Sequence, residues 1–163
     1  MGKNLRFILL LLMVFGVYLV LRGKSAPMPA VFDKGVTLAH ATEASARSGK
    51  PVLALVTADW CGYCQELKRG ALADKNVSSW ITMNTHPVYV DATGGVPEQA
   101  QSLGVHGFPT MVLVREGKEV SRMTGNQPAE AVLTWLRANS GALADYKASG
   151  GDPSMLEAEA KKN

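Results

Sequence analysis

Two cysteines occur in the chain, and both lie in one short motif, Trp60-Cys61-Gly62-Tyr63-Cys64. In small exported proteins, cysteines that act as structural staples usually come in several pairs. Here the chain has no third cysteine with which either of these two could form a structural disulfide. A C-x-x-C pair can therefore do one of two kinds of chemistry. It can cycle between a dithiol and a disulfide, or it can supply half of a metal site.

The alternatives to redox cycling are poorly supported by the rest of the chain. A zinc site needs two more ligands, and His40, His86 and His106 do not show paired zinc-ligand spacing. Covalent haem attachment needs a histidine directly after the second cysteine, where Gln65 stands. A purely structural disulfide stays open as an alternative, although so small a ring restrains little of the unfolded chain. We therefore expect a redox-active pair, with no metal and no dissociable cofactor.

The two cysteines are expected to play different roles. When a C-x-x-C pair begins a helix, unpaired backbone N–H groups and the helix dipole favour the thiolate of the first cysteine. The second cysteine lies one turn further along and is more enclosed. Cys61 is therefore the predicted attacking thiol and Cys64 the predicted resolving thiol, with exchange through a mixed disulfide to a substrate cysteine.

The N-terminus carries an uncharged apolar run from Phe7 to Leu21, preceded by Lys3 and Arg6. Basic residues followed by an apolar run are typical of a secretory signal. As a helix this run would span about 22 Å, against a hydrocarbon core of about 30 Å. Snorkelling of Arg6 and Arg22 would make up part of the difference.

The residues after the apolar run decide between a cleaved signal and an anchor. The small residues Ser25-Ala26 make a poor cleavage site, because Lys24 and Pro27 flank them. We therefore expect residues 1–22 to be an uncleaved signal anchor, with a removed signal peptide as the alternative. The excess of positive groups before the run favours a domain outside the cytoplasm, which in bacteria is the periplasm, tethered to the inner membrane.

Behind the leader, the prolines and glycines of residues 23–36 predict a linker. A folded domain is expected over residues 37–140 and a mobile tail over residues 141–163. Helices are predicted over residues 37–48, 64–72, 76–81, 97–103 and 128–139, and strands over residues 52–57, 87–91, 110–115 and 119–123. This order, a strand-helix-strand unit followed by a β-hairpin and a helix, predicts an α/β domain whose central mixed sheet is flanked by helices.

Size and charge narrow the class of partner. A chain of 163 residues favours one domain, and the net charge of +3 is spread over scattered lysines and arginines. Such a distribution gives no sign of a nucleic-acid partner. The chain also has no glycine-rich phosphate-binding loop.

A second motif, Gly107-Phe108-Pro109-Thr110, follows the cysteine motif at the separation seen in the thioredoxin superfamily, which the chain resembles over roughly residues 36–139. The run Thr57-Ala58-Asp59-Trp60-Cys61 is most similar to the C-terminal thioredoxin-like domain of DsbD, a membrane thiol-disulfide interchange reductase. The dipeptide Gly62-Tyr63 is instead similar to that of the disulfide isomerase DsbC.

The resemblance implies a thioredoxin fold in which Pro109 is cis and faces the cysteines. The backbone of Phe108 would then turn outward and pair with a substrate strand. Beside the cysteines, Trp60 is expected to shape the rim of the site, and Tyr63 is expected to be exposed and to contact substrate. With Phe108 and Pro109 they form the predicted substrate-binding set.

The chain departs from the family at two positions that influence the thiols. Thioredoxins and the DsbD domain carry a buried aspartate where this chain has Leu55, and the DsbD domain has an acidic residue where this chain has Lys68. Asp59 is nearer the motif but is expected to be more exposed. Losing a carboxylate and gaining a cation both favour the Cys61 thiolate, and so a more oxidising disulfide than that of thioredoxin. The alternative is that Lys68 simply points into water.

Together these residues predict a membrane-tethered protein thiol-disulfide oxidoreductase. Its partners would be proteins with cysteines and a dithiol protein that donates or accepts electrons, with the reductase direction favoured by the resemblance. Oxidase or isomerase activity, a role in cytochrome c maturation, and a binding or chaperone module with incidental redox activity remain alternatives.

Overall fold

The computed structural model describes residues 2–22 and 25–141. In chain order the elements are α1 (Gly2–Arg22), α2 (Leu38–Ser48), β1 (Val52–Thr57), α3 (Gly62–Arg69), the 3-10 turn η1 (Ala71–Ala73), α4 (Lys75–Asn84), β2 (His86–Asp91), α5 (Glu98–Ser102), β3 (Thr110–Arg115), β4 (Lys118–Thr124) and α6 (Ala129–Asn139). Each helix and strand predicted for the domain is present. Apart from Gly141, the predicted mobile tail lies outside the described residues.

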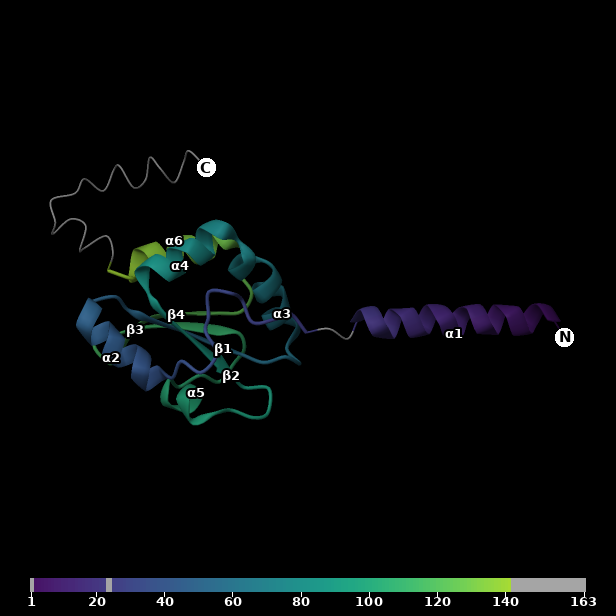
Figure 1. Cartoon of the computed structure of the whole chain (residues 1–163), viewed down its shortest axis with the longest axis horizontal. Coiled ribbons are helices and arrows are strands. Elements are labelled where there is room, and N and C mark those ends of the chain that lie inside the picture. Colours follow the sequence, from purple (N-terminus) through teal and green to yellow (C-terminus); the bar gives the residue numbers. More distant parts are fainter. Residues whose placement is uncertain (1, 23–24, 142–163) are drawn as a thin grey trace.

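The strands form one sheet in the order β2-β1-β3-β4. β1 runs parallel to β2 and antiparallel to β3, and β3 and β4 form an antiparallel hairpin. The sheet is therefore mixed, as predicted, and the parallel pair comes from the strand-helix-strand unit (Figure 1). β1 lies between two neighbours, which places its C-terminal end at the middle of one sheet edge.

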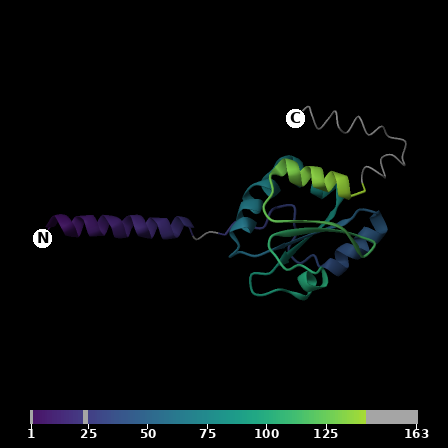
Figure 2. The same ribbon diagram turned by 180° about the vertical axis from the view of Figure 1, so that it is seen from behind.

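Helices cover both faces of the sheet (Figures 1 and 2). Every residue of β1 is buried, with its side chains alternating between two hydrophobic clusters. One cluster lies under α2 and α5, where the small side chains of Ala41 and Ala100 allow close approach. The other lies under α3, α4 and α6 and is filled by larger side chains such as Leu67, Ile81 and Leu136. A run of apolar residues buried on both faces is typical of a parallel-paired strand.

Polar side chains cap the starts of α2 and α4. The side chain of Thr37 accepts the N–H of His40 at 3.2 Å, which confirms the predicted start of α2. Asp74 caps α4 by accepting the N–H groups of Asn76 and Val77. Because these caps pair backbone donors that helix starts leave open, they set where each helix begins.

The apolar N-terminal run forms the helix α1, whose described side chains are mostly exposed. In Figures 1 and 2 this helix extends away from the sheet. Among residues 2–22 and 25–141, none of the helices is both long and apolar enough to cross a membrane. The signal anchor over residues 1–22 therefore stays a prediction from the sequence.

The described part of the predicted linker, residues 25–36, packs against the domain. Ala26 and Phe32 are buried, with exposed fractions of 6% and 1%. The Phe32 ring joins the cluster under α3, α4 and α6. The backbone N–H of Phe32 donates to the carbonyl of Pro29 at 3.0 Å. The prolines and glycines that suggested a tether instead shape a turn, since the apolar side chains among them have a core to enter.

Replacing Phe32 tests whether this segment is part of the folded domain. We expect Phe32→Ala to lower the free energy of unfolding by about 3–5 kcal/mol, the usual cost of emptying a phenylalanine site in a core. Val120→Ala, at a valine that is 47% exposed, is the control and should change it by no more than about 0.5 kcal/mol. Urea unfolding of both variants measures the difference. Equal, small effects would show that the segment is a tether.

His86 makes the stability of the domain depend on pH. Its Nε2 lies 2.7 Å from the hydroxyl of Ser48, and partial burial, followed by the charges of Lys50 and Arg47, lowers its pKa from 6.5. As the pH falls, the unfolded chain therefore binds a proton at His86 before the folded protein does. The folded state has its full stability above pH 6.5 and loses part of it below that pH. We expect the unfolding free energy of His86→Gln to fall less steeply below that pH than that of the wild type. Parallel pH profiles would contradict this assignment.

Candidate active site

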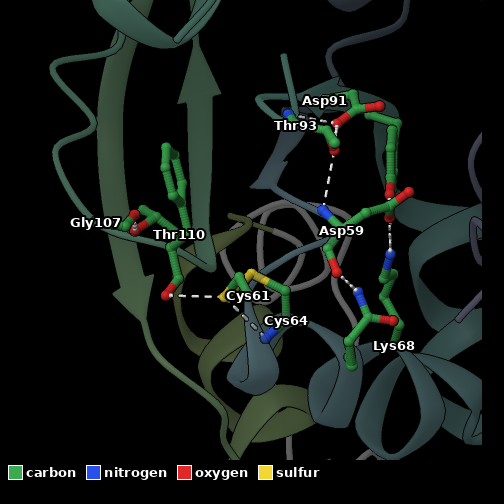
Figure 3. The surroundings of a disulfide bond; sticks show 11 residues. Asp59, Cys61, Cys64, Lys68, Asp91, Thr93, Gly107 and Thr110 are labelled. Carbon is green, nitrogen blue, oxygen red and sulfur yellow. Dashed lines mark hydrogen bonds and ion pairs between the residues drawn. A yellow bond between two sulfur atoms is a disulfide. The ribbon is translucent and has the colours of Figure 1, made fainter. Parts of the chain in front are cut away.

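The two cysteines lie at the start of α3 and form a disulfide, with their Cα atoms 5.2 Å apart (Figure 3). Cys61 is the N-cap residue, and the N–H of Cys64 donates to its Sγ at 3.2 Å. The exposed fractions are 8% for Cys61 and 0% for Cys64. The outer sulfur is thus the reachable one and receives a backbone donor, whereas the inner sulfur is enclosed. This is the asymmetry that the predicted attacking and resolving roles require.

The loop before β3 faces the disulfide. The Phe108-Pro109 peptide bond is cis, as the resemblance implied, and the carbonyl oxygen of Phe108 lies 3.6 Å from Sγ of Cys61. Two hydrogen bonds hold the loop: the N–H of Gly125 donates to the carbonyl of Pro109 at 2.8 Å, and the hydroxyl of Thr110 donates to the carbonyl of Gly107 at 2.9 Å. Two segments distant in sequence therefore meet at the outer sulfur (Figure 3).

Aromatic side chains surround the outer cysteine. Trp60 and Tyr63 each expose 66% of their surface. The rings of Trp60 and Phe108 meet edge to face, with centroids 5.7 Å apart. The indole N–H of Trp60 donates to the carbonyl of Thr93 at 3.2 Å, which fixes the ring at the rim. Exposed aromatic rings beside a reactive group offer a partner an apolar surface with little loss of side-chain entropy.

A buried cation lies on the same helix as the cysteines. The side chain of Lys68 is 1% exposed, and its Nζ lies 3.0 Å from Oδ1 of Asp59, a side chain that is 45% exposed. The same Nζ donates to the hydroxyl of Tyr89 at 3.4 Å. Burial raises the pKa of Tyr89, against the opposing effect of Lys68, so this phenol stays neutral at physiological pH. The alternative that Lys68 points into water is wrong, because the carboxylate of Asp59 gives it a partner inside the domain.

The loop after β2 supports Asp59, and the sequence analysis missed it. The hydroxyl of Thr93 accepts the N–H of Asp59 at 2.9 Å and itself donates to the carboxylate of Asp91 (Figure 3). The N–H of Thr93 also donates to Asp91, at 2.8 Å. A signal was available: β1 and β2 were predicted as parallel strands, whose carboxyl ends meet at one edge of the sheet. Asp91 ends β2 beside the residues that follow β1.

Leu55 takes the position where the family resemblance implied a buried aspartate. It is fully buried and belongs to the cluster that also contains Leu53 and Met111. This position is therefore apolar, and the Lys68–Asp59 ion pair lies instead between the loop after β1 and the second turn of α3. Among the described residues, no cluster of histidine, cysteine, aspartate and glutamate is arranged to hold a metal ion.

Comparison with known proteins agrees with this geometry. A family model described as a thioredoxin-like domain matches residues 38–140. The chain belongs to the thioredoxin-like family. At the level of the family, the prediction of a thiol-disulfide oxidoreductase is confirmed.

Two curated relatives of this thioredoxin-like chain carry names that state an activity. Thiol:disulfide interchange protein DsbD of Pectobacterium atrosepticum is 34% identical over 112 residues, which cover 65% of this chain and 19% of that protein. Protein disulfide isomerase-like 1-1 of Arabidopsis thaliana is 31% identical over 109 residues, covering 64% of this chain and 21% of that protein. The chain thus spans about a fifth of the length of either relative.

Among solved structures, the oxidised C-terminal domain of DsbD from Neisseria meningitidis superposes with a TM-score of 0.55 at 26% identity. The superposition covers 62% of this chain and 90% of that domain. The similarity to the DsbD domain that the cysteine motif suggested is therefore confirmed in both sequence and structure.

Lys68 is buried and Asp59 is half-exposed, so removing either side chain should change the free energy of unfolding by a different amount. Asp59→Ala leaves a buried ammonium without its carboxylate, so we expect it to lower the free energy of unfolding by about 1–3 kcal/mol. Lys68→Met should cost less, since water can solvate the remaining carboxylate. Asp59→Asn keeps the shape of the side chain without its charge and is the matched control. Its loss of unfolding free energy should lie between those of Asp59→Ala and Lys68→Met. Urea unfolding of the oxidised protein measures all three, and a larger loss for Lys68→Met would contradict this account.

Proposed function

We propose that this protein is a thiol-disulfide oxidoreductase that exchanges its Cys61–Cys64 pair with cysteines of proteins outside the cytoplasm, in the reductase direction. One observation carries the proposal: the outer sulfur lies at a helix start, under the carbonyl of Phe108 and inside a rim of exposed aromatic rings, while its partner is enclosed. The electron carriers are the two sulfurs themselves, so no dissociable cofactor is required.

In the reductase direction, exchange takes two steps that balance. The Cys61 thiolate attacks a substrate disulfide; that S–S bond breaks, a mixed disulfide forms, and the released substrate thiolate takes up a proton. Cys64 then loses its proton and attacks Sγ of Cys61, which forms the Cys61–Cys64 disulfide and releases the second substrate thiol. The substrate gains two electrons and two protons, and a dithiol protein must supply them again to restore the reduced pair.

Groups on α3 and in the loop before β3 would stabilise the attacking thiolate and position the substrate. The backbone N–H of Cys64 and the start of α3 stabilise negative charge on the outer sulfur. A substrate backbone lying along Phe108 would present its sulfur to Cys61, because the carbonyl of Phe108 is already within 3.6 Å. Trp60 and Tyr63 would contact the side chains on either side of the substrate cysteine.

The direction of electron flow and the location rest on similarity and on the leader. The likeness to DsbD, which is named for thiol:disulfide interchange, supports exchange with protein thiols. The reductase direction is proposed from the resemblance of residues 57–61 to the DsbD domain. Oxidase or isomerase activity is the second candidate, favoured by Lys68, since a cation near the thiolate stabilises the reduced form and makes the disulfide more oxidising. The apolar run over residues 7–21 supports a periplasmic location with an uncleaved membrane anchor.

Replacing the resolving cysteine tests the exchange. In Cys64→Ala the second step is blocked, so mixed disulfides between Cys61 and its substrates should accumulate in cells. They should appear as high-mass bands on non-reducing gels that disappear with reductant. Cys61→Ala, the matched control, should form few such bands because the enclosed sulfur is not reachable. A binding or chaperone module would keep its partners without any covalent adduct, and that result would overturn the proposal.

A further inference from the structure

The segment before α2 is connected to the residue that directly follows Cys64. The N–H of Ala26 donates to Oε1 of Gln65, and Nε2 of Gln65 donates to the carbonyl oxygen of Asp59 at 3.0 Å. One half-buried amide thus joins the N-terminal segment to the backbone of the residue that pairs with Lys68. The side-chain amide of Gln65 thus accepts a hydrogen bond from Ala26 and donates one to Asp59, and few side chains can do both.

A second contact holds the same segment, through a residue that contacts Lys68. The ring of Phe32 packs edge to face on Tyr89, with centroids 5.9 Å apart and an interplanar angle of 63°. The hydroxyl of Tyr89 in turn lies 3.4 Å from Nζ of Lys68. Residues 26–32 are therefore attached at both ends to groups that contact Lys68 or Asp59.

Residues 25–28 and 33–35, at either end of the segment, line one wall of an open pocket of about 470 Å³. Its far wall includes Asp59, Tyr89 and Asp91. Water can thus reach the carboxylate of Asp59, which is 45% exposed, whereas the side chain of Lys68 beneath it is only 1% exposed. The carboxylate of the pair therefore opens onto the pocket that the segment lines, whereas the cation is enclosed and contacts Tyr89, on which Phe32 packs.

We propose that Gln65 is a positioning residue that holds residues 25–35 over the Lys68–Asp59 pair, so that the reduction potential of the Cys61–Cys64 pair depends on this N-terminal segment. The inference rests on the proposed function, because it assigns the segment a part in the thiol chemistry. The segment lies outside residues 38–140, the part of the chain that matches the family.

The physical link is the screening of a charge by water. An ammonium in a dry environment acts on neighbouring charges several times more strongly than one in contact with water. Lys68 lies one helical turn beyond Cys64, and Asp59 neutralises it from a half-exposed side. If the segment lifts, water screens the ammonium, the Cys61 thiolate loses stabilisation, and the dithiol becomes the stronger reductant.

The test uses the full chain and compares Gln65→Ala with Gln101→Ala. Gln101 is a matched control, because its side chain also donates to a backbone carbonyl, that of Val96 at 3.0 Å, but lies on α5. Two quantities are measured: the equilibrium constant for oxidation of the dithiol by glutathione disulfide, and the rate of Lys68 acylation, by peptide mass spectrometry. A merely structural role for Gln65 would leave the first quantity unchanged.

For Gln65→Ala we expect an equilibrium constant at least threefold larger and Lys68 acylation at least tenfold faster, and no change for Gln101→Ala. Phe32→Ala, which releases the other end of the segment, should act in the same direction. Combining Gln65→Ala with Lys68→Met should give the same equilibrium constant as Lys68→Met alone.

An unchanged equilibrium constant or unchanged acylation of Lys68 in Gln65→Ala would overturn the inference. So would a full shift that persists in the Lys68→Met background, since the effect would then not pass through the cation. These outcomes are separate from failure of the proposed function, which would appear as the absence of mixed disulfides in Cys64→Ala.

Discussion

β1 is buried on both faces along its whole length, between a cluster of small side chains and a cluster of large ones. A strand held in this way cannot shift its register without moving one of its apolar sets out of its cluster. Its C-terminal end is therefore at a defined place on the sheet edge, and the loop from Asp59 to Cys61 begins there. The position of the outer sulfur relative to the loop before β3 follows from this constraint, because β3 pairs with β1 directly.

The charges near the dithiol are arranged around an apolar strand. Leu55 points into the cluster under α3, α4 and α6, so an apolar side chain stands where the resemblance implied a carboxylate. The Lys68–Asp59 pair replaces it at the rim, with the cation enclosed and the anion partly in water. A buried ion pair adds little net stability, because desolvation offsets much of the attraction. In the proposal above, the pair acts instead through its electrostatic influence on the dithiol.

The contacts of the N-terminal segment extend the site beyond the family domain. Ala26 and Phe32 lie before the matched residues, yet they contact Gln65 and Tyr89, which in turn contact the ion pair. The described part of the segment, from residue 25 onward, is therefore packed against the domain that carries the cysteines.

The sequence alone determined the elements, the mixed sheet, the chemistry of the cysteine pair and the family, because these depend on local pattern: apolar runs, caps, turn residues and the spacing of two motifs. It also placed Pro109 and Phe108 at the site through resemblance. Only the tertiary structure decided what Lys68 does, which residues support Asp59, and that residues 25–36 belong to the domain. Each of these depends on a neighbour distant in the chain, and a side chain's partner and burial come from packing, which local periodicity does not encode.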